Sequence, residues 1–333
     1  MKNLYKVYGR VRLNGRLSDK FNMGKGLKQG DSLSPLLFNI LMDKICKDCN
    51  NKSRQFRTKI GHWNLKPIHI QTLLFADDIA IIASTPDKLQ QLLQIWEEKL
   101  KETHMIINTN KSKILEITKE KEKQEINIQM NGETLEVVEE FTYLGTVFTK
   151  NGKITREVQQ RIKKATNVYY SINHTIISKK EITEKTKLQI YNSVYKPTLT
   201  YGSESWPINT KIEKQVTAAE MKFLRRITNK TRRDHERNNK IRDDLKVTPL
   251  IQEIEKKQLK WYGHMKRMDK ERIPRKCWEA RMEGRKGRGR PRTSWLDSIT
   301  EAGKKRGKTL NQMNTLVEDR KEWRRFTEMD PTL

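Results

Sequence analysis

Two adjacent carboxylates, Asp77 and Asp78, interrupt an otherwise apolar run at residues 73–82. β-Branched residues follow them, so the run predicts two short strands joined by a tight Ala-Asp-Asp turn, in a hairpin that is apolar and buried throughout except at its tip. Carboxylates about 4 Å apart repel each other by about 4 kcal/mol at an effective dielectric of roughly 20, unless a positive charge lies beside them. Hard oxygen donors on a rigid turn suit Mg²⁺, with Mn²⁺ as the alternative ion. The competing interpretation is a solvated turn without a ligand.

A glycine-rich stretch at residues 24–35 precedes a helix-like run at residues 36–45. Ser34 is expected to cap this helix, and Pro35 suits its first position. A loop that ends at a helix N-terminus presents backbone N–H groups and the positive end of the helix dipole to an anion. The stretch is therefore a candidate phosphate-binding loop, although the same arrangement is common in proteins of every kind.

The composition points to a polyanionic partner. The 333 residues include 69 Lys and Arg against 41 Asp and Glu, which gives a net charge of +28. Such an excess favours nucleic acid over other partners. No apolar run approaches the length of a membrane span, so no membrane partner is expected. Three cysteines give no disulfide framework, which fits an intracellular protein, and we favour the nucleus over the cytoplasm.

Four sequence blocks resemble those of one enzyme family. Residues 29–38 (QGDSLSPLLF) and residues 75–78 (FADD) resemble, in order and spacing, two signature blocks of reverse transcriptases of non-LTR (LINE-like) retrotransposons. Residues 108–113 look like the next block, usually Asn-x-x-Lys-Thr, with Ser112 in place of Thr. Residues 143–145 (YLG) look like the short hairpin block that borders the primer.

The resemblance implies a fold of the α+β class in three parts. Residues 1–150 would form a partial polymerase palm, an antiparallel sheet with packed helices. Residues 151–229 would form a helical, thumb-like region, whose Lys and Arg side chains either follow the template–primer backbone or form a solvated basic face. Residues 230–333 would form a basic C-terminal region of helices and linkers. The implied activity is RNA-directed DNA polymerisation by two-metal chemistry on an RNA template, a DNA primer and deoxynucleoside triphosphates.

The resemblance also assigns roles to individual residues. Asp77 would be the metal-binding carboxylate of the hairpin, and Asp78 its supporting neighbour. Lys111 would neutralise or protonate the departing pyrophosphate. Gln29 and Gly30 would lie near the incoming nucleotide and the template, while Phe75 would lie against the primer end.

One carboxylate of the implied site has no counterpart in the sequence. In the family it lies on a strand ahead of the Gln-Gly loop, whereas Asp19 is the only acidic residue before Asp31 and its surroundings do not match that strand. We therefore expect an N-terminally truncated, C-terminal portion of a retrotransposon polymerase that is inactive or very weak alone. The alternatives are a non-catalytic nucleic-acid-binding protein derived from a retrotransposon, and a pseudogene product that folds poorly.

Hydrophobic periodicity predicts the elements around these blocks. Asn14-Gly15 and Asn131-Gly132 favour hairpin turns. Residues 86–101 predict a helix with one apolar face beneath the sheet, in which Trp96 is a core residue rather than a base-stacking one. Further helices are expected at residues 158–172, at residues 188–195 with an end at Pro197, and at residues 212–226. A charged linker is expected at residues 232–240.

The C-terminal region offers two more candidates. Trp261 and Tyr262 stand among basic residues, which suits either single-stranded nucleic acid or, in our preferred interpretation, a small helical core. Residues 285–292 (RKGRGRPR), with Arg288 and Arg290, are similar to an AT-hook that enters the minor groove of A·T-rich DNA. A nuclear localisation patch or a flexible basic linker would have the same composition. The amphipathic residues 309–326 are expected to fold back.

Overall fold

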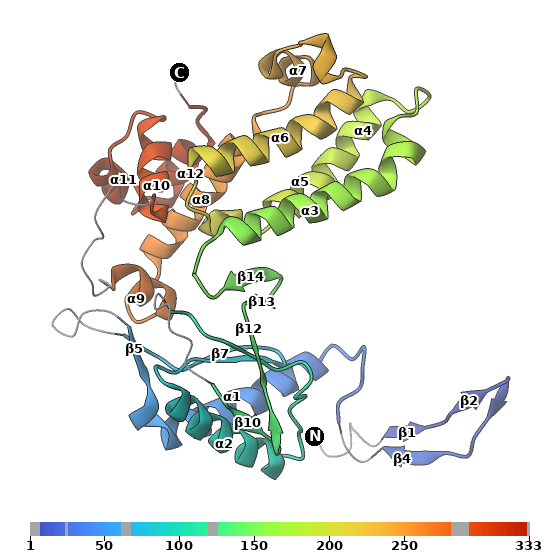
Figure 1. Cartoon of the computed structure of the whole chain (residues 1–333), viewed down its shortest axis with the longest axis vertical. Coiled ribbons are helices and arrows are strands. Elements are labelled where there is room, and N and C mark those ends of the chain that lie inside the picture. The colour runs from blue at the N-terminus through green and yellow to red at the C-terminus, as the bar shows by residue number, and fades with distance from the viewer. Residues whose placement is uncertain (1–6, 24–25, 61–67, 119–125, 281–292, 332–333) are drawn as a thin grey trace. The chain divides into compact units, whose positions relative to one another are not determined.

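The computed structural model describes residues 7–23, 26–60, 68–118, 126–280 and 293–331 (Figure 1). The chain divides into two compact units, which are described separately: unit 1 comprises residues 1–112 and 124–136, and unit 2 comprises residues 113–123 and 137–333. Both contain helices and short antiparallel strands, so the predicted α+β class is confirmed. None of the helices in the described part of the chain is long and apolar enough to cross a membrane.

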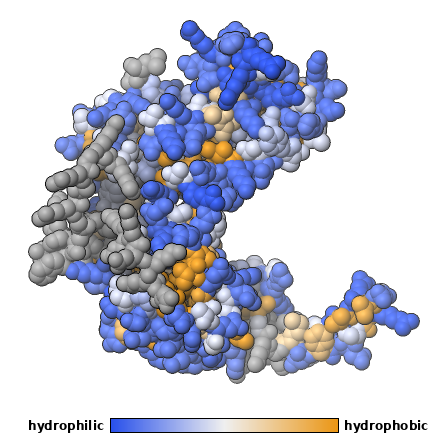
Figure 2. All heavy atoms as spheres, viewed as in Figure 1, coloured by the Kyte–Doolittle hydropathy of each residue, from blue (hydrophilic) through white to orange (hydrophobic). Residues whose placement is uncertain are grey.

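Unit 1 begins with a two-stranded ribbon. β1 (Val7–Gly9) pairs antiparallel with β4 (Phe21–Met23), and β2 (Arg12–Leu13) pairs with β3 (Arg16–Leu17). Asn14 and Gly15 both have positive φ angles, of 47° and 82°, which form the primed turn that matches the twist of two strands. The predicted hairpin is confirmed, and its apolar side chains lie exposed along the ribbon (Figure 2).

The core of unit 1 forms between two helices and one hairpin. α1 (Ser34–Lys52) packs on α2 (Pro86–Glu102) through Ile45, Cys49 and Trp96, among others. The hairpin of β7 (Thr72–Phe75) and β8 (Asp78–Ile81) adds apolar side chains to the same cluster. Trp96 is fully buried there, which confirms its prediction as a core residue.

Shorter strand pairs complete unit 1. β5 (Thr58–Ile60) pairs with β6 (Ile68–Ile70), and β10 (Gln129–Met130) pairs with β11 (Glu133–Thr134). Asn131 and Gly132 take positive φ angles between β10 and β11, as their sequence predicts. The Gln90 side chain on α2 exchanges two hydrogen bonds with the backbone of Gln129, which fixes this second hairpin on the helix.

Unit 2 starts with strands and continues as a helical bundle. β9 (Lys113–Leu115) pairs with β12 (Glu136–Val138), and β13 (Glu140–Tyr143) forms a hairpin with β14 (Thr146–Thr149). α3 (Thr155–Ile172) and α6 (Thr210–Ile227) follow, and they pack side by side around Tyr169 and Phe223 (Figure 1). The helices predicted at residues 158–172 and 212–226 are confirmed.

Pro197 does not end the helix before it, contrary to the prediction. α4 (Glu184–Ile190) runs through a π-helical turn, Tyr191–Tyr195, into α5 (Lys196–Thr200). The wider π-helical turn changes the hydrogen-bonding register just ahead of Pro197, so the missing N–H of the proline is accommodated. Tyr191 and Tyr195 on this turn are fully buried against Phe223.

Residues 232–240 are structured rather than a linker. Arg232–Asp234 form a 3₁₀ turn whose start is capped reciprocally by Thr231 and Asp234. α7 (Asn238–Leu245) follows, and its Arg242 side chain donates to the buried Glu220 carboxylate on α6 at 2.6 Å. The charge pattern predicted a linker because it gave no sign of the Thr231–Asp234 cap or of the helix that follows, although most of the segment is exposed.

The C-terminal helices enclose an aromatic cluster. α8 (Leu250–Arg267), α10 (Trp295–Lys304), α11 (Leu310–Leu316) and α12 (Arg320–Glu328) bury Tyr262, Trp323 and Phe326, with α9 (Ile273–Glu279) beside α8. A Cβ on Gly263 would lie 2.0 Å from Nε1 of Trp323, so this close approach requires glycine. The C-terminal segment therefore folds back, as predicted, and Tyr262 belongs to a helical core. Trp261 is only partly buried and lies beside His264.

Candidate active site and neighbouring motifs

The Asp-Asp hairpin has a two-residue loop. Phe75 pairs with Asp78, so Ala76 and Asp77 form the turn and Asp78 is the first residue of β8. Ala76 has a φ angle of 51°, a left-handed conformation that costs a residue with a Cβ about 1 kcal/mol or more. A strained alanine directly before Asp77 holds the carboxylate at the outermost point of the hairpin.

The hairpin is not buried throughout, contrary to the prediction. Side chains alternate across the two strands, and Leu74 and Ile79 pack into the core between α1 and α2. Leu73 and Phe75 point the other way and are 39% and 62% exposed. A two-stranded sheet buries both faces only where a second layer covers it, and the described residues supply a layer on one face alone.

Neither carboxylate of the pair has a partner among the described residues. Asp77 and Asp78 are both exposed, and no described side chain or backbone N–H forms a hydrogen bond or an ion pair with their carboxylates. By the strand register, Asp78 shares the open face of the hairpin with Phe75. Their oxygens are the hard donors that Mg²⁺ prefers, and this ion characteristically takes one or two carboxylates with water and phosphate oxygens. The donor set therefore fits one shared cation with its remaining ligands from outside the hairpin.

Ser34 stabilises the Gln-Gly loop, but it does not cap the helix as predicted. α1 begins at Ser34, whose hydroxyl donates to the carbonyl of Lys28 at 2.7 Å instead of capping the helix. The Asp31 carboxylate accepts from the Leu33 N–H at 3.0 Å and so stabilises the turn before the helix. Gln29 and Gly30 are exposed, and the φ angle of 89° at Gly30 explains the glycine.

The Asn-x-x-Lys block forms a compact turn that displays a lysine. The Asn108 side chain accepts from the Lys111 N–H at 3.1 Å, and the Asn108 carbonyl accepts from both the N–H and the hydroxyl of Ser112. A hydroxyl at position 112 is sufficient for this bond, so serine replaces threonine without loss of the contact. Lys111 is exposed.

Sequence reasoning missed a buried cluster in unit 2 that holds the turn of the β13–β14 hairpin. Leu144 and Gly145 form this turn with φ angles of 47° and 79°. Arg161 on α3 donates to the Gly145 carbonyl and, at 2.5 Å, to the Glu157 carboxylate. Glu157 also accepts from the N–H of Val147 at 2.7 Å.

An aromatic ring completes this cluster. The Tyr201 hydroxyl donates to the Leu144 carbonyl at 2.9 Å, and the Arg161 guanidinium lies 4.5 Å from the centre of the Tyr201 ring. The four-residue spacing of Glu157 and Arg161 on one helix was visible in the sequence, but it is also typical of surface ion pairs. Their burial, and their bonds to the hairpin, were not visible.

The predicted site residues thus occupy separate features. Phe75, Asp77 and Asp78 lie on one hairpin, whereas the Gln-Gly loop and Lys111 lie on other loops of unit 1. No hydrogen bond or ion pair between described residues joins these loops to the two aspartates. Arg288 and Arg290 lie outside the described residues.

The Asp-Asp hairpin, the Gln-Gly loop, the Asn-x-x-Lys turn and the turn at Leu144 and Gly145 all lie in the part of the chain that is similar to a known family. Residues 1–148 match the family described as reverse transcriptase (RNA-dependent DNA polymerase). Parts of the chain are similar to the Pol polyproteins of the type-2 retrotransposable element R2DM of Drosophila melanogaster and of the type-1 retrotransposable element R2 of Nasonia vitripennis. Each match has 29% identity, over 165 and 141 residues. The N-terminal part of the chain is therefore similar to a reverse transcriptase domain, and the matched relatives are Pol polyproteins of retrotransposable elements.

The extent of these matches differs greatly between relatives. The two polyprotein matches cover 46% and 39% of this chain but only 15% and 13% of the relatives. A putative uncharacterized transposon-derived protein of Caenorhabditis elegans is 28% identical over 265 residues, which is 77% of this chain and 94% of that protein. The chain thus spans nearly all of this relative but only a small part of the two Pol polyproteins.

Proposed function

We propose that the Asp77–Asp78 hairpin supplies metal-binding carboxylates for RNA-directed DNA polymerisation by two-metal nucleotidyl transfer. The observation that carries the proposal is the exposed carboxylate pair at a strained turn, with no partner among the described residues. A bound Mg²⁺ pair would activate the primer 3′-hydroxyl and stabilise the charge on the triphosphate.

The other residues act around this pair in the proposal. Asp77 is the principal ligand and Asp78 supports it from the open face of the hairpin. Phe75 offers its exposed ring on that face as a support for the primer end. Lys111 holds a positive charge, and a transferable proton, for the leaving pyrophosphate. Gln29 and Gly30 present the loop ahead of α1 to the deoxynucleoside triphosphate and the template.

The chain alone is proposed to be inactive or very weak. The described residues contain no group of three or more His, Cys, Asp or Glu side chains that could hold a metal ion. One carboxylate pair cannot fix two cations, and a displacement of about 1 Å in a reacting group can cost on the order of a hundredfold in rate.

Primer extension on poly(rA) with an oligo(dT) primer and Mg²⁺ tests this proposal. We expect little or no synthesis, and any residual synthesis should disappear in Asp77→Asn but persist in the control Asp87→Asn, which changes an exposed carboxylate at the start of α2. Robust synthesis that Asp77→Asn leaves unchanged would overturn the role of the pair. Robust synthesis that Asp77→Asn abolishes would overturn only the proposed inactivity.

A second candidate function is nucleic-acid binding without catalysis, which the net charge of +28 favours. Its affinity should fall steeply with salt and should be the same in the Asp77→Asn variant. Absence of RNA or DNA binding at moderate salt would exclude both candidates.

The basic segment around Arg288 and Arg290 is proposed to bind A·T-rich DNA through its narrow minor groove. The double variant Arg288→Ala/Arg290→Ala should lose any preference for an A·T-rich duplex over a G·C-rich one. Equal affinity of the unaltered chain for both duplexes would reduce the segment to an unspecific phosphate-binding region.

A further inference from the structure

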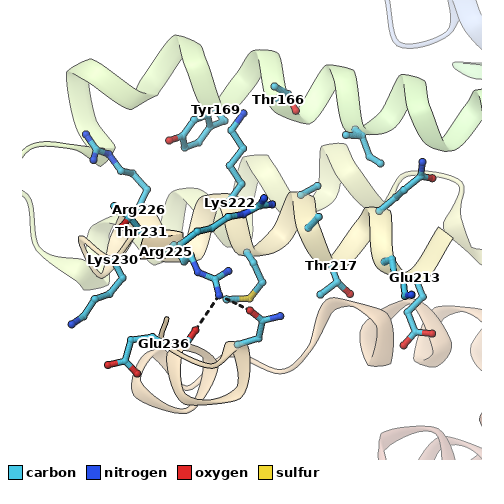
Figure 3. Close-up of a pocket in the computed structure, with 18 of the residues that line it drawn as sticks. Thr166, Tyr169, Glu213, Thr217, Lys222, Arg225, Arg226, Lys230, Thr231 and Glu236 are labelled. Carbon is cyan, nitrogen blue, oxygen red and sulfur yellow. Dashed lines mark hydrogen bonds between the residues drawn. The ribbon is translucent and has the colours of Figure 1, made fainter. Parts of the chain in front are cut away.

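Unit 2 contains an open groove between α3 and α6 that the polymerase blocks do not include. Its volume is about 1380 Å³, and its walls come from these helices and from the segment that follows α6 (Figure 3). Pockets for small ligands typically have volumes of about 300–1,000 Å³ and enclose most of the ligand. The size and openness of this groove suit part of a polymer instead.

The charge of the groove is concentrated near the end of α6. Lys222, Arg226, Lys230 and Arg232 line it, and none of them forms an ion pair with a described residue. In Figure 3, Arg226 and Lys230 lie at one end, and Glu213 lies at the opposite end. This distribution favours an anion with several charges at the basic end.

Two other charged residues at the basic end, Arg225 and Glu236, already have partners within the protein. The Arg225 guanidinium donates to the Glu236 carbonyl at 3.2 Å and to the Asn238 side chain at 2.6 Å. The Glu236 carboxylate accepts from Lys240 at 3.0 Å, so a cation already balances its charge. Arg225 therefore fixes the segment after α6, and the other cations remain available to a ligand.

An exposed aromatic ring lies beside this charge. Tyr170 on α3 is 59% exposed, whereas the adjacent Tyr169 is 8% exposed and lines the groove. The Lys222 ammonium donates to the Tyr170 hydroxyl at 3.0 Å and lies 4.2 Å from the centre of its ring. This bond anchors a large ring in a mostly solvent-exposed position at the edge of the groove.

We propose that this groove binds single-stranded nucleic acid, with phosphates along Arg226, Lys230 and Arg232 and one base stacked on Tyr170. A single strand offers unstacked bases, and stacking on an aromatic side chain stabilises binding by about 1–3 kcal/mol per base. The bases of a duplex are stacked on one another, so they would not stack on the exposed ring. The inference takes nucleic acid as partner from the proposed function, but it needs neither Asp77 nor catalysis.

Fluorescence anisotropy on the full chain tests the groove, with labelled single-stranded oligonucleotides of 12 nucleotides, in RNA and DNA form, and a duplex of the same length. Tyr170→Ala should weaken single-strand binding by roughly 5- to 150-fold. Tyr170→Phe keeps the ring and should retain most of the affinity. The logarithm of the single-strand binding constant falls as the logarithm of the salt concentration rises. Arg226→Ala/Lys230→Ala should make this fall shallower, by about 1.4 in the slope, because two phosphate contacts are lost.

Two controls separate this site from the general charge of the protein. Lys164→Ala removes an exposed lysine of α3 that does not line the groove, and it should change the affinity by less than about twofold. All variants are also measured with Arg288→Ala/Arg290→Ala, so that the basic C-terminal segment cannot mask the groove. Thermal melting checks that each variant is folded.

Crosslinking tests the contact between a base and Tyr170 independently of affinity. A single strand carrying one photoreactive 5-iodouracil should crosslink to Tyr170, and the crosslink should persist in Asp77→Asn. Single-strand affinity that is equal in Tyr170→Ala and the unaltered chain would overturn the inference, as would tighter binding of the duplex. Intact groove binding together with robust primer extension that Asp77→Asn leaves unchanged would count against the proposed role of the Asp77–Asp78 pair alone.

Discussion

Carboxylates in the two units have opposite environments. In unit 2, Glu157 and Glu220 are fully buried, and each accepts hydrogen bonds from an arginine and from a backbone N–H. In unit 1, Asp77 and Asp78 are exposed and have no partner among the described residues. Of these four carboxylates, only Asp77 and Asp78 are open to a ligand.

The difference follows from the cost of burying charge. A buried carboxylate is tolerated only where its oxygens are paired, because desolvation costs several kcal/mol per ion. The oxygens of the two glutamates are therefore already bonded to arginines and backbone N–H groups of the protein. The aspartates avoid this cost because they remain in water, and water also reduces their mutual repulsion. Stability and ligand binding are thus assigned to different carboxylates, and four predictions test this separation.

The largest effect is expected from Arg242→Met. This change leaves Glu220 buried without its cation and should lower the free energy of unfolding by about 3–5 kcal/mol at pH 7. Burial already raises the pKa of the Glu220 carboxyl, and loss of Arg242 should raise this pKa further. A carboxyl with a raised pKa in the folded state favours folding at low pH, and this contribution is lost as the pH rises through the folded-state pKa.

Urea denaturation at pH 5 and pH 7 measures this effect. The loss caused by Arg242→Met should be smaller at pH 5, where more of Glu220 is protonated. The double variant Glu220→Gln/Arg242→Met should recover part of the stability at pH 7. Equal losses at both pH values would contradict an ionised, uncompensated Glu220 as the cause.

Arg161→Met is expected to lower the free energy of unfolding by about 3 kcal/mol, because Glu157 loses its cation and the Gly145 carbonyl loses its donor. Tyr201→Phe removes only the bond to the Leu144 carbonyl and should cost about 1 kcal/mol. Chemical denaturation gives both values, and hydrogen exchange at the Val147 amide reports on the hairpin directly. Unchanged exchange in Arg161→Met would show that the cluster does not hold the turn.

Asp77→Asn should change the free energy of unfolding by no more than about 0.5 kcal/mol, since the side chain is exposed and without a described partner. A cation that binds the folded state should raise the melting temperature of the unaltered chain, and this shift should be lost in Asp77→Asn. Thermal melts with and without Mn²⁺ measure both effects, with Asp87→Asn as the matched control. A cation-dependent shift that is the same in Asp77→Asn would place the ion elsewhere.

The smallest effect is expected at an exposed ion pair of unit 2. The Arg156 guanidinium donates to the Glu140 carboxylate and lowers the pKa of this carboxyl below its ordinary value. A lowered folded-state pKa stabilises the fold above the unfolded-state pKa, and this contribution is lost as the pH falls through the folded-state pKa. Arg156→Gln should return the Glu140 pKa toward its ordinary value in an NMR titration, with almost no change in melting temperature. A large change in melting temperature would mean that even exposed pairs stabilise this unit.

Local features of the protein were determined by the sequence alone. The Asn14-Gly15 and Asn131-Gly132 turns follow from residues that tolerate positive φ angles, and α2, α3 and α6 follow from hydrophobic periodicity. Each of the four sequence blocks is a short run of consecutive residues, so the similarity to reverse transcriptases was visible in the sequence. The proposed roles of Asp77, Asp78 and Lys111 remain predictions, because a motif specifies residue types and order but not a bound ligand.

Tertiary structure alone decided which side chains are paired and which faces are covered. Arg242 and Glu220 are 22 residues apart in the sequence, and Arg161 and Gly145 are 16 residues apart. No local sequence pattern could therefore predict either contact. The exposure of Phe75 was mispredicted for the same reason. Whether an apolar strand is buried depends on the layer packed against it, and that layer comes from distant parts of the chain. Burial then decides which carboxylates serve the fold and which remain open to a ligand.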